Sequence, residues 1–301
     1  MNKWLRRSGL GVLTLAGLGA AALVVGAQLG ERKMQRRIDV KVSPVALRVD
    51  AASVERGRYL FMSRGCTECH AADGAGKDVV NDGKGFLVHA PNITPAAGSV
   101  VAAYSASDWV RTIRHGVKPD GRPALVMPSE DYARLTDDDL GALVAFLRQM
   151  PAATGAGAKI EFPLPVKAFY GAGLVQDAAE KIDHTLPVSR PVPEAVTAEH
   201  GAYVANSCIG CHGAGLSGGQ VPGGPPDWPA AANLTTGEGS AMTLYPTPDS
   251  FVTMLRSGKR PDGSAISPVM PFAALKELSD TDARAIYLHL KTMPPRAAGQ
   301  H

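Results

Sequence analysis

Two short cysteine–histidine motifs carry the chemistry that this sequence allows. Residues 66–70 read Cys-Thr-Glu-Cys-His, residues 208–212 read Cys-Ile-Gly-Cys-His, and together they hold all four cysteines of the chain. Cys-x-x-Cys-His is the attachment sequence of haem c. Two intervening residues let one helical turn present both sulfurs to one edge of the porphyrin, where they form thioethers, and the adjacent histidine offers a ring nitrogen to the iron. The motifs therefore predict two covalently bound haem c groups, attached through Cys66, Cys69, Cys208 and Cys211, with His70 and His212 as iron ligands.

Other uses of these cysteines agree less well with their spacing. No cysteine is left over to form a disulfide framework outside the motifs. A structural zinc site needs four ligands, which usually come from two pairs close in sequence, and here the pairs are far apart. A thioredoxin-like redox pair sits at a strand-to-helix junction, and the sequence predicts none there.

The chain repeats itself with an offset of about 142 residues. Besides the cysteine motifs, an Asn-Ile/Leu-Thr triplet, an aromatic residue before Arg-x-Gly, a Pro-Asp-Gly and two Met-Pro pairs recur in the same order. Such a series does not arise by chance from composition. We predict an N-terminal segment over 1–33, a first domain over 45–151, a Pro- and Ala-rich linker over 152–194, and a second domain over 195–301.

The repeat also predicts the second axial ligand of each iron. Met127 and Met270 are both followed by proline and both lie in a loop before the last predicted helix of their repeat. A thioether sulfur is a soft, neutral ligand that favours Fe(II) and raises the potential. We predict that His70 and Met127 bind one iron and that His212 and Met270 bind the other, although packing in a loop or core is the alternative for both methionines.

Hydrophobic periodicity and capping signals predict helices at matching places in the two repeats. No convincing run of alternating apolar and polar residues predicts a strand, so the expected fold class is all-α. The expected helices cover 54–63, 107–115 and 136–150 in the first repeat and 199–206, 248–257 and 279–292 in the second, with one short helix near 176–182 in the linker.

Three further matched pairs are candidates for contact with haem propionates or haem edges, with a purely structural role as an equal alternative. The basic pair is included because a guanidinium binds carboxylates bidentately. The pairs are Asn92 and Asn233, Trp109 and Phe251, and Arg114 and Arg256. The histidines at 89, 115, 184, 200 and 289 are not matched between the repeats, so we expect them at the surface or satisfied in a core.

The N-terminus contains an apolar segment long enough to cross a membrane. Residues 9–27 carry no charge, and as a helix they span about 28 Å, close to the thickness of a bilayer core. We favour an uncleaved anchor because this run is longer than a usual signal core. The alternative is a cleaved signal peptide with Val25-Gly26-Ala27 as its cleavage site, which gives a soluble periplasmic protein. In both cases the haem domains lie outside the bacterial cytoplasmic membrane.

These residues resemble the class I c-type cytochrome family, in a tandem form with two haems. The resemblance is carried by Cys-x-x-Cys-His near the start of each repeat and Met-Pro before its last helix, and it implies an all-α fold wrapped around each haem. The Asn-Ile-Thr, Trp-Val-Arg-x-Ile-Arg-x-Gly and Met-Pro-Ser-x-x-Tyr sequences of the first repeat are similar to membrane-anchored cytochrome c subunits of periplasmic dehydrogenases. Such subunits commonly carry three haems, whereas this chain has two motifs.

The expected function is electron transfer between a periplasmic dehydrogenase or quinol donor and a respiratory-chain acceptor, such as a soluble cytochrome or a terminal oxidase. The chain is then a carrier and not an enzyme. The alternative is a dihaem redox enzyme, such as a cytochrome c peroxidase or a thiosulfate-oxidising cytochrome, which needs an open iron site or unlike ligands in the two repeats. A net charge of +3 with no dense basic run beyond the N-terminus gives no reason to expect nucleic acid as a partner.

Overall fold

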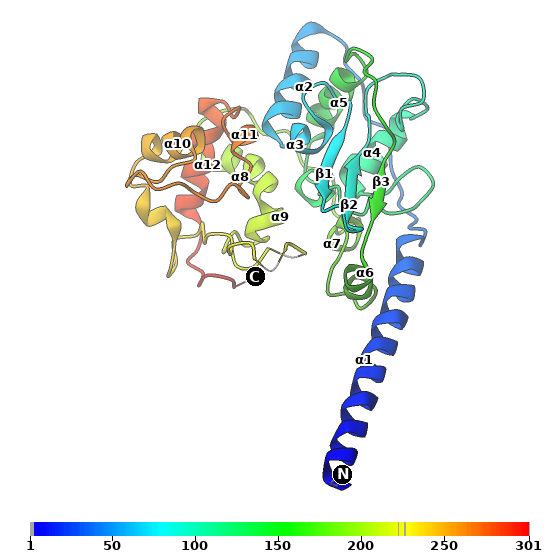
Figure 1. Cartoon of the computed structure of the whole chain (residues 1–301). Helices are drawn as coiled ribbons and strands as arrows, with labels where there is room; N and C mark the ends of the chain where they lie inside the picture. The colour runs from blue at the N-terminus through cyan, green and yellow to red at the C-terminus, as the bar shows by residue number, and fades with distance from the viewer. Residues whose placement is uncertain (1–2, 222, 226, 301) are drawn as a thin grey trace.

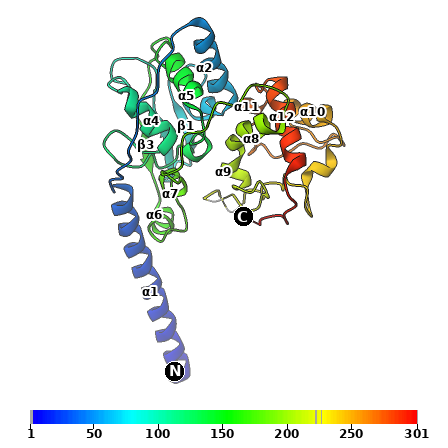
Figure 2. The same cartoon turned by 180° about the vertical axis from the view of Figure 1, so that it is seen from behind.

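The computed structural model describes residues 3–221, 223–225 and 227–300. Met1 and His301, the outer limits of the predicted ranges, lie outside the described residues. The chain forms two globular halves that sit side by side, and one long helix, α1 (Lys3–Met34), projects from the first half (Figure 1). Seen from behind, α1 again stands clear of the second half over most of its length (Figure 2). We call residues 45–151 the first repeat and residues 195–301 the second.

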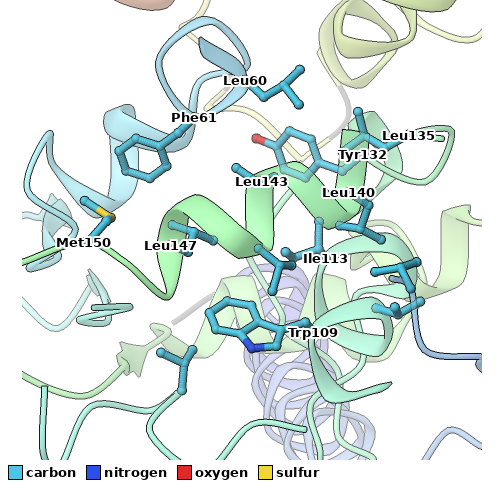
Figure 3. Packing of buried hydrophobic residues seen from close by; sticks show 14 residues of the cluster. Leu60, Phe61, Trp109, Ile113, Tyr132, Leu135, Leu140, Leu143, Leu147 and Met150 are labelled. Carbon is cyan, nitrogen blue, oxygen red and sulfur yellow. The ribbon is translucent and has the colours of Figure 1, made fainter. Parts of the chain in front are cut away.

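The first repeat is built around two crossing helices. Its elements are α2 (Ala51–Ser63), α3 (Cys66–His70), α4 (Ala106–His115), the 3-10 turn η1 (Ser129–Asp131) and α5 (Asp137–Leu147). Helix α2 packs directly across α5, and a side chain at Gly57 would bring its Cβ within 2.0 Å of the Ala142 carbonyl oxygen. The core on this crossing includes Phe61, Trp109 and Leu143 (Figure 3).

The second repeat uses the same construction. Its elements are α8 (Ala198–Ala205), the 3-10 turn η2 (Asn206–Cys208), α9 (Ile209–His212), the 3-10 turn η3 (Ala241–Leu244), α10 (Pro248–Ser257), α11 (Phe272–Leu275) and α12 (Asp280–Thr292). Helix α8 crosses α12 where a Cβ at Gly201 would lie 1.9 Å from the Ala285 carbonyl oxygen. The two repeats therefore bring their first and last helices together by the same glycine-dependent contact.

Capping explains why the predicted helices lie where they do. Thr136 and Ser279 each accept a hydrogen bond from the third residue of the helix that follows, which fixes the starts of α5 and α12. Gly116 and Gly258, with φ of 65° and 67°, end α4 and α10 in the left-handed conformation that favours glycine. The predicted helices agree with the structure to within three residues at each end.

The all-α prediction is wrong in one respect. The chain contains a three-stranded antiparallel sheet in the order β1 (Lys77–Asn81), β2 (Leu87–Ala90) and β3 (Lys159–Glu161). The strands have three to five residues, and β1 is almost wholly exposed, so no apolar–polar alternation marks it. The turn signal Asp82-Gly83 between β1 and β2 was present in the sequence, but the prediction did not use it.

The segment between the repeats is folded against the first repeat and α1. Besides β3 it contains α6 (Leu164–Gly171) and α7 (Ala178–Lys181), and α7 falls within the range where a short helix was expected. Helix α6 was not predicted. It crosses the C-terminal end of α1, where a Cβ at Gly30 would lie 2.0 Å from the Lys167 carbonyl oxygen. The segment therefore joins the long apolar helix firmly to the globular part of the chain.

Candidate functional site

Each cysteine motif forms a single helical turn that ends in a sharp reversal. In the first repeat the turn is α3, and Ala71 after it has φ of 60°. In the second repeat the turn is α9, and Gly213 has φ of 75°. A positive φ is uncommon for alanine and marks a constrained position. The loop then returns to the motif, because the Gly76 and Gly218 N–H groups donate to the carbonyl oxygens of His70 and His212 at 3.0 and 2.9 Å.

The two motif histidines are held in the same tautomer. Nδ1 of His70 lies 2.9 Å from the Pro91 carbonyl oxygen, and Nδ1 of His212 lies 2.8 Å from that of Ala232. A carbonyl oxygen only accepts, so Nδ1 carries the hydrogen and Nε2 keeps its lone pair. Burial lowers the pKa of both imidazoles, which keeps them neutral. A neutral imidazole oriented through its other nitrogen by a backbone carbonyl is the usual state of a metal-binding histidine.

The cysteines are free thiols in surroundings that do not activate them. All four are unpaired, and Cys211 is exposed while the others are partly buried. Burial raises the pKa of Cys66 and of Cys208 to about 12, with a smaller contribution from Cys69 beside Cys66 and from Asp131 near Cys208. Reactive and zinc-binding cysteines need the thiolate, and a raised pKa opposes it. Within the described residues no group of three or more His, Cys, Asp or Glu side chains could hold a metal ion, which further disfavours the zinc alternative.

The two candidate methionines occupy equivalent turns. The residue two positions after each, Ser129 or Phe272, donates its N–H to the methionine carbonyl oxygen at 2.8 Å. Met127 packs on the core of the first repeat together with Cys66, and Met270 packs on the core of the second together with Cys208. Each methionine therefore borders the same core as the cysteine motif of its own repeat. By contrast, Met150 is 6 % exposed within the first core, as expected for a packing residue.

The other matched residues have structural partners. Asn92 and Asn233 are 2 % exposed, and each accepts from the N–H and hydroxyl of the threonine two positions later, at 2.8–2.9 Å. They therefore pin their loops. Arg114 and Arg256 bind the start of the last helix of their own repeat through Asp137 and Asp280.

The aromatic pair is also part of the cores. Trp109 and Phe251 are buried and stack edge-on against Tyr104 and Tyr245. Among the unmatched histidines, His200 is buried against Asp282, and His115 contacts His184 through their Nδ1 atoms at 3.0 Å.

The two cysteine motifs lie at the interface between the repeats. The Gly210 N–H, inside the second motif, donates to Asp131 Oδ1 at 2.8 Å, and Asp131 belongs to η1, which follows Met127. In the reverse direction, α11, which follows Met270, contacts α3. The attachment turn of each repeat therefore faces the segment that follows the candidate methionine of the other repeat in sequence. Figure 1 shows α3, α9 and α11 along the boundary between the halves.

A reciprocal pair of tyrosine–aspartate contacts fixes this interface. Tyr59 on α2 donates to Asp282 on α12 at 2.6 Å, and Tyr203 on α8 donates to Asp139 on α5 at 2.6 Å. Each tyrosine hydroxyl also accepts from the N-cap N–H of that same helix, at 3.0 Å from Ser279 and 3.3 Å from Thr136. Residues at equivalent positions thus exchange equivalent bonds, so the repeats are related by an approximate two-fold axis.

The two aspartates differ in their remaining partners. Asp139 binds Arg56 of its own repeat at 2.8 and 3.0 Å, and this arginine is about one quarter exposed. Asp282 is fully buried and binds His200 of its own repeat at 2.7 Å and Arg64 of the other repeat at 2.8 Å. Arg64 is itself buried and immediately precedes the turn into the first motif. Sequence reasoning missed this network, although Tyr59 and Tyr203 recur at equivalent positions and could have been matched.

Comparison with known families now decides what the two halves are. Residues 54–151 match the family model described as cytochrome c, and residues 195–290 match that described as cytochrome c oxidase, cbb3-type, subunit III. The chain is a c-type cytochrome. Its two cytochrome domains carry the two motifs, one in each.

Several curated relatives are similar to the cytochrome over most of its length. The alcohol dehydrogenase (quinone) cytochrome c subunit of Gluconobacter oxydans is 28 % identical, over 84 % of this chain and 57 % of that protein. The gluconate 2-dehydrogenase cytochrome c subunit of Pantoea cypripedii is 26 % identical, over 83 % and 61 %. The cytochrome thus spans little more than half the length of these relatives. A diheme cytochrome c-type protein of Cereibacter sphaeroides is 26 % identical over 85 % of this chain and 90 % of its own.

The cytochrome carries two covalently bound haem c groups, one for each cytochrome domain. The geometry of the two motifs fits that group. In each repeat the first cysteine, Cys66 or Cys208, borders the apolar core, and the motif histidine has its Nδ1 hydrogen already bound to a carbonyl oxygen. This arrangement fits thioether formation and ligation through Nε2.

Proposed function

We propose that this cytochrome carries electrons between a dehydrogenase or quinol donor and a respiratory-chain acceptor, and that electrons pass between its two haems within one molecule. The observation that carries the proposal is the interface: both attachment turns lie on it, and reciprocal tyrosine–aspartate contacts hold it in one arrangement. The relatives include cytochrome subunits of alcohol, fructose and gluconate dehydrogenases, which supports a dehydrogenase as the donor.

In this proposal the chain supplies attachment, ligation and orientation. Cys66 and Cys69 would hold one haem and Cys208 and Cys211 the other, and the two irons would be bound by His70 with Met127 and by His212 with Met270. When bound, each haem stores one electron by the change of its iron between two oxidation states. The carbonyl oxygens of Pro91 and Ala232 fix the histidine rings, and the interface fixes one domain against the other.

We further propose that α1 is a retained membrane anchor with the haem domains in the periplasm. The part of the chain that the structure describes has one helix long and apolar enough to cross a membrane, within residues 9–34. A signal sequence passes the same test, but Ala27, at the alternative cleavage site, is 4 % exposed and lies where α1 packs on α6. Arg36 just beyond α1 pairs with Asp177 at 2.7 Å. These contacts make the end of α1 part of the folded domain, which supports retention.

Electron transfer between the haems is tested by flash photoreduction of the purified, fully oxidised protein, so that one electron enters each molecule. We expect it to redistribute between the haems at a rate that does not depend on protein concentration. A rate proportional to concentration would mean exchange between molecules and would contradict the proposal. Rapid binding of carbon monoxide or peroxide by the native protein would favour a dihaem enzyme, because catalysis at iron needs an open site.

Removal of one cysteine pair is expected to remove one haem only. The double change Cys66→Ala and Cys69→Ala should lower the covalent haem content from two to one, since the thioethers of the second repeat remain. Intact mass under denaturing conditions measures this directly, and the change Cys208→Ala with Cys211→Ala is the matched control for the other haem. A mass equal to that of the bare polypeptide in the unaltered protein, or two haems in either variant, would refute the attachment assignment.

A further inference from the structure

Helix α6 and the turn that follows it carry exposed apolar side chains at the point where the long helix α1 enters the globular part. Its members are Leu164 at 54 %, Phe169 at 52 % and Leu174 at 73 % exposed. We call these three residues the α6 patch. Isolated exposed apolar residues are common and need no explanation, but large ones gathered on a single short segment mark an interaction site.

Backbone hydrogen bonds at the end of α6 link the positions of two of these residues. The Leu174 N–H donates to the Phe169 carbonyl oxygen at 2.9 Å, and the Gly173 N–H donates to that of Tyr170 at 3.2 Å, with Gly173 at φ of 77°. This is a Schellman motif, in which the residue after the left-handed glycine commonly makes an apolar contact with the residue five positions earlier. In this chain both members of that pair remain exposed to solvent.

The position of α6 along α1 indicates what covers the patch. Helix α6 crosses α1 at Gly26 and Gly30, where added Cβ atoms would lie 3.1 Å from Ala168 Cβ and 2.0 Å from the Lys167 carbonyl oxygen. The apolar run of α1 ends at Ala27, before Gln28, and at 1.5 Å per residue Gly30 lies about 4.5 Å beyond Ala27. If residues 9–27 fill the bilayer core, α6 lies at the boundary between hydrocarbon and water.

Charge around the crossing also fits a phospholipid surface. The exposed residue Arg32 and the partly buried Lys33 lie within one turn after Gly30, and Lys167 lies on α6 itself. Lys167 pairs with Glu31 at 2.7 Å and so holds α6 against α1, and Lys33 pairs with Glu180 on α7 at 2.9 Å. Basic residues beside exposed Leu and Phe are typical of segments that lie in the interface plane of a membrane.

We propose that the α6 patch inserts into the outer surface of the bilayer that α1 spans, so that the cytochrome meets the membrane at two places and its first domain is held at a set height and tilt. This rests on the membrane anchoring proposed above. The apolar surface of α1 continues as far as Val25 and Leu29, which are 55 % and 48 % exposed. The close crossing at Gly26 and Gly30 holds α6 beside this surface.

Photo-crosslinking in a membrane tests the contact. The full-length protein, with both haems, carries p-benzoylphenylalanine at position 169 or 174 and is placed in nanodiscs of phosphatidylethanolamine and phosphatidylglycerol. Position 49 is the matched control, because Val49 is 70 % exposed in the loop before α2. After illumination, mass spectrometry should find lipid adducts at 169 and 174 in about tenfold higher yield than at 49, since an interfacial apolar face contacts acyl chains.

The outcomes separate this proposal from the ones on which it rests. Equal adduct yields at 169, 174 and 49 in an intact, nanodisc-bound chain would overturn the α6 contact and leave the anchor in place. Adducts with a second copy of the chain would overturn it in favour of a protein contact. A mass that lacks the first 27 residues, with loss of the chain from the nanodisc fraction, would overturn both the anchor and the contact. The flash-photoreduction result does not depend on any of these outcomes.

Discussion

The change Met127→Ala or Met270→Ala is expected to lower the reduction potential of one haem by on the order of 100 mV and to open its iron to carbon monoxide. A methionine thioether is neutral and soft and therefore stabilises Fe(II), and its loss leaves water or a vacancy at the sixth position. The two residues lie in equivalent turns beside the cores of their own repeats, so each change should affect one haem. Redox titration and the carbon monoxide difference spectrum measure the two effects.

Two other methionines provide the matched control. Met150 and Met293 also recur between the repeats and precede proline, but they follow the last helices and pack on the cores. Met150→Ala and Met293→Ala should lower stability and leave both potentials and carbon monoxide binding unchanged. Unaltered carbon monoxide binding in Met127→Ala would contradict the assignment of this ligand, and the same holds for Met270→Ala.

The duplication explains why so much of the fold could be predicted from the sequence. The main landmarks appear twice, so the prediction of α4, which has a weak signal on its own, is supported by that of α10. Both helices begin with a capping box and end at a left-handed glycine. The short strands escaped prediction because three to five residues are too few to show a periodic pattern, and β1 and β3 are also mostly exposed. Helix α6 escaped for a different reason: Pro165, Gly171 and Gly173 give it the composition of a loop, and its stability comes from packing on α1.

In the functional site, too, residues that are adjacent in sequence could be predicted, whereas contacts between distant residues could not. The motif cysteines and histidines are adjacent in sequence, so their chemistry could be predicted from residue types alone. Arg114 and Arg256, which we considered for haem propionates, bind the starts of α5 and α12 through an aspartate carboxylate and a neighbouring carbonyl oxygen. In the sequence, Asp139 and Asp282 are marked only as acidic residues near the start of a predicted helix. Their role between the domains depends on partners more than 60 positions away, which periodicity does not report.

Asp282 is the interface residue whose loss should cost the most stability. Asp282→Asn is expected to lower the free energy of unfolding by about 3–5 kcal/mol, because it leaves the buried Arg64 guanidinium without its carboxylate. Burial alone would raise the pKa of Asp282, but the charge of Arg64 and the hydrogen bond from Tyr59 outweigh it and hold the pKa below its ordinary value of 3.8. The stabilisation is therefore present above that value and is lost as the pH falls through the lower folded pKa. Denaturant unfolding of the holoprotein at neutral and acidic pH measures the loss of stability and its dependence on pH.

Asp139→Asn is the matched control for this change, since it alters the equivalent residue of the other repeat. Arg56, its partner, is about one quarter exposed, so water can solvate the guanidinium when the carboxylate is gone. The expected loss is therefore smaller, about 1–3 kcal/mol. Equal losses in the two variants would show that burial of Arg64 is not the source of the difference.

If the interface also positions the haems, Asp282→Asn should slow electron redistribution after flash photoreduction while each haem keeps its spectrum, because the ligands of both irons are untouched. A slowed rate with intact spectra distinguishes a change in domain placement from damage at either haem.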